Sequence, residues 1–334
     1  MDRCLTNKRI LFFSPAFFGY EQKIKDKFQE LGATVDMFNE RSVIKTYQLA
    51  LLKVVPSIFF RITERYYFNI LEKIRGNKYD YILFVKCDMP TDNVLRNYRN
   101  VFKRSKFCLH MWDSTKNIRG VIKKFSYFDY ISSFDRNDYM VYEQIHFRPL
   151  FYCDDYKKAL CENNDCKYDL CFVGTIHSDR YKILKEIRRQ AEAKNLLVYI
   201  YPYLQSRFIY YFYKITKPEF LNTKISDFKF KKLSSQEIAE IINESRLVID
   251  IQHPEQTGLT MRTIEMLGMS KKIMTTNADI EHYDFYNPDN ICIIDRNKIV
   301  IGDCLNKEYC PLGNELYMKY SLEAWAYGVL GIEK

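Results

Sequence analysis

Short apolar runs alternate with amphipathic stretches from the start of the chain. RILFFSP at 9–15 has the unbroken hydrophobicity of a buried strand, and the stretch 20–32 after it places apolar residues at helical spacing and ends at Gly32. TVDMF at 34–38 has the pattern of a second strand. Strand, helix and strand in this order predict parallel strands joined by crossover helices.

The alternation continues along the chain, with one interruption. We expect a long helical region at 44–75, and the capping-box pair Ser234 and Glu237 predicts a helix that runs through Glu244. The pattern loosens at 150–167, a polar stretch with cysteines that we interpret as the link between two domains. Further strands are expected within 79–90, 106–114, 127–135, 168–175, 195–203, 246–253, 271–277 and 290–295.

A chain of 334 residues is long enough for two domains. We therefore predict an α/β protein with two Rossmann-like, doubly wound domains, at 1–150 and 168–316, and a C-terminal helical segment at 317–334 that can pack back on the first domain. Ligands of such sheets bind at the carboxyl ends of the strands, which is where Gly174 and Gly258 fall.

Composition narrows the class of protein. A net charge of +9, spread among 27 Tyr and 24 Phe, suits an acidic partner such as nucleotide phosphates, an anionic membrane surface or nucleic acid. The 10 cysteines include no Cys-x-x-Cys pair, which is typical of free thiols in a reducing cytosol. The N-terminus lacks a signal-peptide cleavage site, and no apolar run reaches the roughly 18 residues of a membrane span. We expect a cytoplasmic protein.

The stretch QHPEQTGLTMRTIEMLGMSKKIMTTN at 252–277 has the pattern of a turn followed by a helix. If the helix starts near Gly258 or Leu259, its unpaired N–H groups and the hydroxyls of Thr257 and Thr260 form a seat for a diphosphate. Arg262 and Glu265 share one face, so that Arg262 can bind phosphates and Glu265 can accept both hydroxyls of a ribose. An ordinary surface ion pair at helical spacing explains these two residues equally well.

A second turn, FVGTIHSDR at 172–180, joins a predicted strand to a predicted helix. Gly174 and Thr175 can present backbone donors to phosphates, with His177 and Arg180 directly after them. A plain strand-to-helix turn is the alternative.

The segment 245–277 resembles the donor-binding region of GT-B glycosyltransferases, where a Gly-containing turn leads into a helix with an Arg and a ribose-binding Glu. Together with 79–90, 111–117, 127–139 and 168–184, it resembles the bacterial lipopolysaccharide and capsular polysaccharide biosynthesis proteins related to CgeB-like and group 1 glycosyltransferases. The resemblance implies a cleft between two Rossmann-like domains and a nucleotide sugar bound mainly by the C-terminal one. It also implies a glycan or lipid-linked glycan acceptor, no cofactor and no obligatory metal.

The same resemblance implies a catalytic base in the N-terminal domain. The candidates are Asp113, His110 and Asp88. We favour Asp113, because it ends a predicted strand beside Ser114 and Thr115. A solvated loop aspartate or a helix cap is the alternative. Acidic pairs such as those in DRND and CDDY are the candidates for a metal site, but we expect no metal.

Two aromatic and basic stretches, at 49–75 and 203–220, suit interfacial helices on anionic lipid. They suit equally well buried helices with a charged rim. For the first stretch, the residues that would contact lipid are Lys53, Arg61, Arg65, Lys73 and Arg75.

The function predicted from the sequence is transfer of a sugar from a nucleotide sugar to a cell-surface glycan. Two rivals stay open: a sugar-nucleotide epimerase of the same fold, and a non-catalytic scaffold or nucleotide- or RNA-binding protein. We expect no nucleic-acid partner, because neither an RRM-type aromatic signature nor a KH Gly-x-x-Gly loop is present. There is also no Walker loop or Gly-x-Gly-x-x-Gly motif, which speaks against an ATPase or a nicotinamide enzyme.

Overall fold

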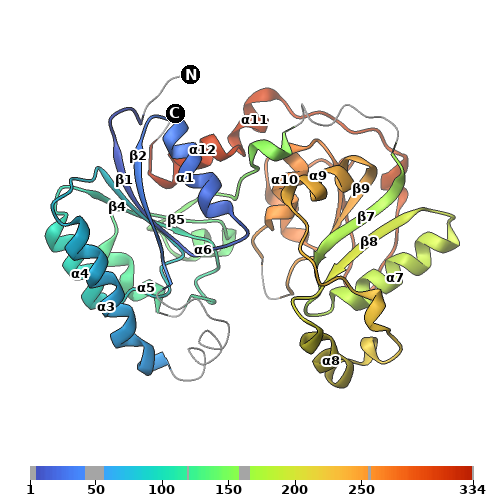
Figure 1. Ribbon diagram of the computed structural model, residues 1–334. Coiled ribbons are helices and arrows are strands. Elements are labelled where there is room, and N and C mark those ends of the chain that lie inside the picture. The colour runs from blue at the N-terminus through green and yellow to red at the C-terminus, as the bar shows by residue number, and fades with distance from the viewer. Residues whose placement is uncertain (1–4, 42–55, 119, 158–165, 255–256, 333–334) are drawn as a thin grey trace. The chain divides into compact units, whose positions relative to one another are not determined.

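The computed structural model describes residues 5–41, 56–118, 120–157, 166–254 and 257–332. The chain forms two compact units, and each is described by itself. Unit 1 comprises Met1–Pro149 together with Leu322–Lys334, and unit 2 comprises Leu150–Ser321. Each unit is built around a parallel sheet with helices on both faces, as predicted (Figure 1).

The sheet of unit 1 has the strand order β2-β1-β3-β4-β5-β6, all parallel. The topological switch point of this sheet, where the direction of winding reverses, lies between β1 and β3. β2 is added on one side of β1, and all later strands are added on the other side. The strands are β1 (Arg9–Ser14), β2 (Thr34–Asn39), β3 (Tyr81–Val85), β4 (Lys106–Met111), β5 (Tyr130–Ser133) and β6 (Ile145–Phe147).

Alternate residues of these strands pack on different helices. Phe12 contacts Phe28 of α1 at a ring-centroid distance of 6.2 Å, whereas Phe13 contacts Tyr67 of α3 at 5.4 Å. Helices α1 and α12 therefore lie on one face of the sheet, and α3 and α4 on the other (Figure 1). Within the described residues, the helices of unit 1 are α1 (Tyr20–Glu30), α3 (Pro56–Ile74), α4 (Asp92–Val101), α5 (Val121–Lys124), α6 (Arg136–Val141) and α12 (Leu322–Val329).

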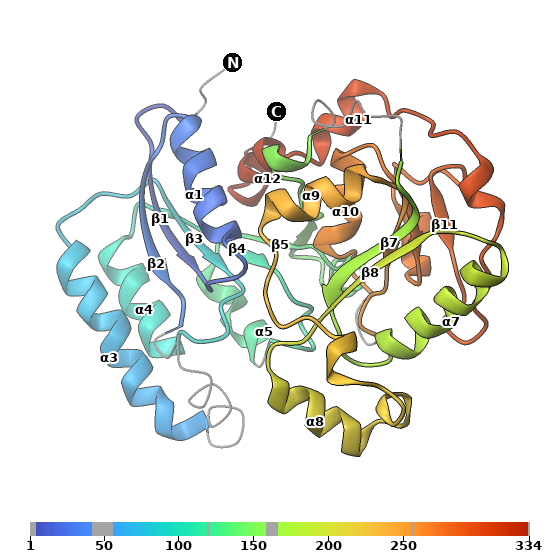
Figure 2. The same cartoon turned by 45° about the vertical axis from the view of Figure 1, so that its right-hand side comes forward.

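The sheet of unit 2 has the order β11-β10-β9-β7-β8, again all parallel. Helices α9 and α10 cover one face and α7 covers the other (Figure 2). The strands are β7 (Tyr168–Thr175), β8 (Val198–Tyr203), β9 (Ser245–Asp250), β10 (Lys272–Thr275) and β11 (Ile291–Ile293). The helices are α7 (Arg180–Ala193), α8 (Arg207–Thr216), α9 (Ser235–Asn243), α10 (Met261–Gly268) and α11 (Asn314–Lys319).

Local signals located several helix ends. The capping box is confirmed: the Ser234 hydroxyl accepts a hydrogen bond from the Glu237 N–H, and the Glu237 carboxylate accepts one from the Ser234 N–H. Gly32 follows α1 with φ +98, a conformation that favours glycine. For the long helical region, only α3 lies within the described residues, since 42–55 fall outside them.

The interpretation of 150–167 as a polar link is wrong for its first part. Phe151 and Tyr152 are fully buried, Tyr152 forms an isolated β-bridge to Ser321, and a 3₁₀ turn covers Asp154–Tyr156. These residues are part of unit 2, where the ring of Tyr152 packs on that of Tyr317 with 4.9 Å between centroids. Residues 158–165 of this stretch lie outside the described part of the chain.

None of the described helices combines the length and the hydropathy needed to cross a membrane.

Candidate functional site

The centre of the unit 2 sheet is the place where its winding direction changes. β8 is added beside β7 on one side, and β10 and β11 are added beyond β9 on the other. In doubly wound sheets, ligands bind outside the carboxyl ends of the two strands at such a point. Here those ends are Thr175 and Asp250, and the turns that follow them contain the predicted donor-binding residues.

Arg180 ties these two turns together. It is the first residue of α7, and its guanidinium donates to the Thr175 carbonyl at 3.0 Å and to the Ile251 carbonyl at 2.5 Å. Burial lowers the pKa of Arg180, while the Asp250 carboxylate acts in the opposite direction. The predicted phosphate-binding arginine thus fixes the geometry of the site with two of its five N–H donors.

Gly174 lies in β7 two residues from Phe172, and a Cβ at this position would come within 3.0 Å of the Phe172 ring. This close contact gives a packing reason for glycine at the end of the strand. The backbone of the next turn is left-handed at Ser178, where φ is 49.

Two histidine rings lie beside each other after β7 and β9. The rings of His177 and His253 are 5.6 Å apart between centroids. Burial lowers the pKa of His177 to about 3, with smaller contributions in the same direction from Arg180 and His253. His177 is therefore a neutral imidazole at pH 7, able to donate one hydrogen bond and accept another. His253 was not predicted, although it stands directly after the β9 run in the sequence.

Arg296 is a second residue that sequence reasoning missed. Its guanidinium donates to Asp179 at 2.5 Å, to the Gln252 carbonyl at 2.8 Å and to the Thr276 hydroxyl at 3.2 Å. It thus links the ends of β7, β9 and β10 although it follows β11 in the chain. The sequence did contain a signal for this residue, because Arg296 directly follows the predicted strand at 290–295, where ligands of such sheets bind.

Helix α10 begins later than predicted, at Met261, with Thr260 as its N-cap. The Thr260 hydroxyl accepts from the Thr263 N–H at 3.3 Å and donates to the Asp250 carboxylate at 3.0 Å. The Thr263 hydroxyl donates to the same carboxylate at 2.7 Å. Since Asp250 ends β9, the start of α10 is held against the strand end.

The remaining predicted residues of this turn, Thr257 and Gly258, directly precede the cap. The carbonyl of Thr257 accepts a hydrogen bond from the Asn277 side chain at 2.9 Å, and Gly258 is buried. The turn is therefore connected to the end of β10 as well as to α10.

Arg262 and Glu265 form the ion pair that helical spacing allows, with 2.9 Å between Nη1 and Oε2. It is a buried pair, because only 2% of the Glu265 side chain and 19% of the Arg262 side chain are exposed. The alternative of an ordinary surface pair is therefore wrong. Burial and the Glu265 charge raise the pKa of the neighbouring Tyr156. The ribose contact of Glu265 stays a prediction, and in this structure its carboxylate is first of all the partner of Arg262.

In unit 1, two candidate bases lie around one lysine. Lys86 Nζ is 2.7 Å from Asp113 Oδ2 and 3.8 Å from Asp88 Oδ2. Lys86 and Cys87 have φ values of 82 and 61, a left-handed conformation that is strained for residues with side chains. Asp113 keeps 32% of its side chain exposed, so its carboxylate is accessible from solvent.

Glu40, which the sequence did not single out, lies beside this group. It is fully buried directly after β2, and burial together with the Asp88 charge raises its pKa to about 8. Its Oε1 accepts from the Met89 N–H at 3.2 Å, and its Oε2 has no hydrogen-bond partner among the described residues. Burial therefore favours the protonated, uncharged form of Glu40.

His110 is a correction to the candidate bases. Its ring is fully buried in β4, its Nδ1 lies 2.9 Å from the Ser132 hydroxyl, and Trp325 packs edge-on at 5.1 Å. Burial lowers its pKa to about 3. An imidazole enclosed in this way cannot reach an acceptor hydroxyl, so His110 is a core residue.

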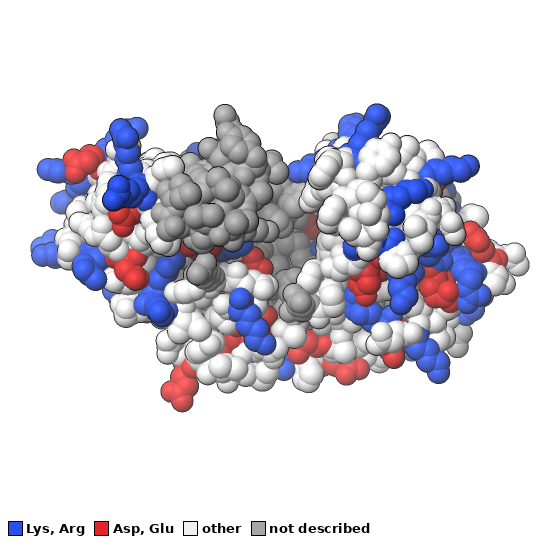
Figure 3. Space-filling model, turned by 90° about the horizontal axis from the view of Figure 1, so that it is seen from below, with Lys and Arg blue, Asp and Glu red and all other residues white. Residues whose placement is uncertain are grey.

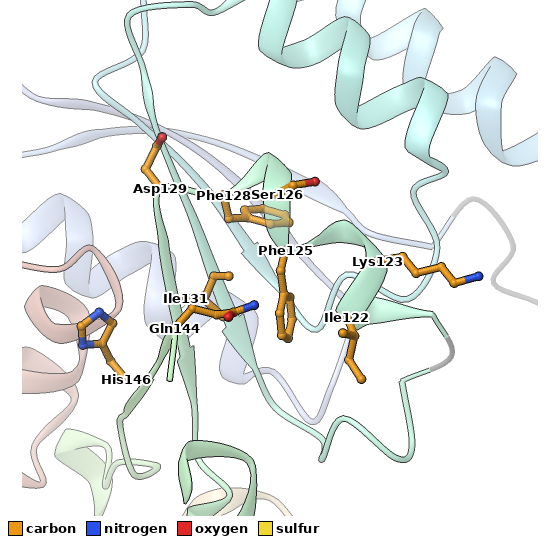
Figure 4. Close-up of a pocket in the computed structure, with 9 residues that line it drawn as sticks. All are labelled: Ile122, Lys123, Phe125, Ser126, Phe128, Asp129, Ile131, Gln144 and His146. Atoms are coloured by element: carbon orange, nitrogen blue, oxygen red, sulfur yellow. The ribbon is translucent and has the colours of Figure 1, made fainter. Parts of the chain in front are cut away.

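Unit 1 also carries a surface cavity of about 450 Å³ near α5, β5 and β6 (Figure 4). None of the predicted site residues lines it. Its lining mixes apolar and polar side chains: Ile122, Lys123, Phe125, Ser126, Phe128, Asp129, Ile131, Gln144 and His146.

Comparison with known proteins gives similarity in structure alone. No family model matches the chain, and none of the curated proteins matches it. Among solved structures, OtsA in its apo form is similar with a TM-score of 0.64 at 8% identity, over 97% of this chain and 98% of that one. The chain has the GT-B fold.

Two further structures of this fold were solved with ligands. Anabaena HepE in complex with UDP and glucose has a TM-score of 0.53 at 10% identity, covering 97% of this chain and 95% of that one. The Methanocaldococcus jannaschii UDP-GlcNAc 2-epimerase in complex with UDP-GlcNAc and UDP has a TM-score of 0.52 at 8% identity, covering 95% and 98%. The fold is therefore shared with an epimerase, one of the enzyme classes that the sequence left open, and with a protein solved in complex with UDP and glucose.

Proposed function

We propose that this protein is a glycosyltransferase that moves a sugar from a nucleotide-sugar donor to a growing cell-surface glycan, of the lipopolysaccharide or capsule type. The observation that carries the proposal is the group of arginines at the switch point of unit 2. Arg180 and Arg296 both hold the turns after β7 and β9, and Arg262 lies in the first turn of α10. Such a concentration of positive charge suits a diphosphate.

The chemistry follows from these roles. In an inverting transfer, the acceptor hydroxyl gives its proton to a carboxylate, its oxygen bonds to the anomeric carbon, and the bond from that carbon to the diphosphate breaks. The N–H groups at the start of α10 and the arginines would stabilise the charge on the departing nucleoside diphosphate. We assign the proton acceptor to Asp113, which Lys86 holds in place, with Asp88 as the second candidate.

The proposed reaction would take place in the cytoplasm, at the membrane. A cytoplasmic protein that builds such a glycan on a lipid carrier would work at the inner face of the membrane. Nucleotide sugar and glycan are its only substrates in this account, with neither metal nor cofactor.

The alternative enzyme is a sugar-nucleotide epimerase, which the likeness to the UDP-GlcNAc 2-epimerase supports. The two differ in one respect that can be measured. An epimerase converts the sugar nucleotide by itself, whereas a transferase releases nucleoside diphosphate and lengthens an acceptor.

The test is to incubate the protein with a panel of sugar nucleotides, with and without lipid-linked glycan, and to follow products by mass spectrometry. We expect nucleoside diphosphate and a longer glycan only when both substrates are present. Arg296→Gln should raise KM for the donor at least tenfold, since a charge-assisted hydrogen bond is worth about 1.5 to 3 kcal/mol. Arg189→Gln, on the exposed surface of α7, is the matched control. Conversion without acceptor would favour the epimerase, and nucleotide binding without turnover would favour a non-catalytic protein.

A further inference from the structure

Helix α8 exposes a continuous apolar stripe. Phe208, Tyr211, Phe212 and Ile215 follow each other at helical spacing, so they share one face. Their exposed fractions are 77%, 57%, 54% and 85%. Side chains of this size are rarely left in water side by side, and such a stripe marks a surface for a partner.

The opposite face anchors the helix to unit 2. Tyr210 is buried, packs on Phe228 at 5.5 Å and donates its hydroxyl hydrogen to the Thr223 carbonyl at 2.9 Å. Lys214 donates to the same carbonyl at 2.6 Å, and the Ser206 hydroxyl caps the start of the helix. The apolar stripe is therefore held outward by specific contacts on the inner side.

The other aromatic and basic stretch, at 49–75, differs from α8 because the apolar face of its described helix, α3, is buried. The residues Tyr67, Ile70, Leu71 and Ile74 of α3 are buried in the core of unit 1. Arg61, Arg65, Lys73 and Arg75 form an exposed rim around this buried face, and Lys53 lies outside the described residues. The reading of a core helix with a charged rim therefore holds for α3, whereas α8 has the exposed apolar face of an interfacial helix.

The segment that contains the stripe is rich in positive charge. Residues 205–232 contain seven Lys or Arg and two Asp or Glu. Seen from the side on which α8 lies in Figure 1, the surface of unit 2 shows uncharged side chains next to basic ones and some acidic ones (Figure 3). The exposed basic residues of this segment are Arg207, Lys224, Lys229, Lys231 and Lys232.

We infer that α8 docks unit 2 on an anionic lipid surface. The side chains of the stripe enter the boundary between headgroups and acyl chains, and the basic residues contact lipid phosphates. Charge selects this occupant over a second copy of the chain, because two copies joined by this surface would bring their basic segments together. This membrane contact rests on the proposed function, because the lipid-linked acceptor of such a glycosyltransferase would lie at the same membrane surface.

The test is co-sedimentation of the full chain with vesicles of phosphatidylcholine, with and without phosphatidylglycerol, at low salt. We expect sedimentation with the anionic vesicles only, and release by added salt. The double variant Phe208→Gln/Ile215→Gln should lower the apparent affinity at least tenfold. The matched control is Leu197→Gln/Val300→Gln, which replaces two exposed apolar residues of unit 2 away from α8 and should bind as the wild type does.

Three outcomes would overturn the inference: wild-type protein that stays in the supernatant, a stripe variant that sediments like its control, or a wild-type dimer that the stripe variant dissociates. The last result would identify a second copy as the occupant. Vesicle binding needs no sugar nucleotide, so its failure is separate from a failure of the proposed function. Conversely, intact vesicle binding without transfer would contradict the proposed activity alone.

Discussion

At the scale of single residues, the chemistry of the site depends on how each charge is held. Arg180 is fixed by two backbone carbonyls, Arg296 by a carboxylate, a carbonyl and a hydroxyl, and Arg262 by the buried Glu265. Arginines with this much support lose little further freedom when they bind a ligand. The same support means that removing a partner changes stability as well as binding.

Glu265→Ala should therefore destabilise unit 2. The substitution leaves the mostly buried Arg262 without its carboxylate partner. Breaking a buried ion pair in this way costs at least about 3 kcal/mol of unfolding free energy. We expect a cost near this lower limit, because Arg262 keeps some exposure to solvent. Urea unfolding followed by circular dichroism measures the change. The control is Glu186→Ala, which removes half of an exposed Arg–Glu pair of the same spacing on α7 and should leave the midpoint unchanged. Equal midpoints for the two variants would show that the buried pair adds nothing.

Glu40 should make stability depend on pH. Its pKa is about 8 in the folded protein and 4.5 as an ordinary glutamate, so the folded state binds more protons between these values. The stabilisation is complete below pH 4.5 and is lost as pH rises through 8, at up to about 1.4 kcal/mol per pH unit. Glu40→Gln should remove this dependence. We would compare the unfolding free energies of both proteins across that range, and parallel curves would contradict the assignment.

At the scale of elements, the closest packing in unit 2 includes the contact between helix α10 and the segment 152–156. α10 packs so closely on the segment 152–156 that a Cβ on Gly268 would lie 2.5 Å from Tyr152 Cγ and from the Tyr156 carbonyl oxygen. This contact brings Tyr156 to the Arg262 and Glu265 pair. The sequence predicted the helix and its apolar face, because periodicity is local, but it could not predict a contact with residues that it assigned to a link.

Gly268→Ala should accordingly destabilise the protein by about 1 to 3 kcal/mol, the usual cost of overpacking a core. The measurement is the thermal unfolding midpoint. Gly313→Ala is the control in the same unit, since a Cβ there meets nothing within 4 Å. A Gly268 variant as stable as the control would mean that the segment 152–156 can move away from α10.

At the scale of the whole molecule, strand order explains what the sequence could and could not predict. The two α/β halves and the turns after β7 and β9 could be predicted, since hydrophobic runs and turn residues are read locally. The roles of Arg296 and Glu40 could not, because they depend on which strand ends lie side by side. His110 was misassigned for a related reason: a polar residue in a strand can face a core as well as a ligand.

In the proposed reaction, transfer should need no divalent metal. Arginines and the start of α10 supply the positive charge that a cation would otherwise bring to the diphosphate. Adding a chelator should therefore leave the rate of nucleoside diphosphate release largely intact. Complete loss of activity, restored by manganese, would contradict this.

In the proposed reaction, a nucleoside diphosphate binds at the switch point of unit 2. Hydrogen–deuterium exchange with and without a panel of nucleoside diphosphates tests it most directly, because it locates the ligand without requiring an acceptor or turnover. We predict that at least one nucleotide slows exchange in 174–180, 250–263 and 294–297, and raises the melting temperature. No protection with any nucleotide, or protection confined to the cavity near α5 and β6 in unit 1, would contradict the account.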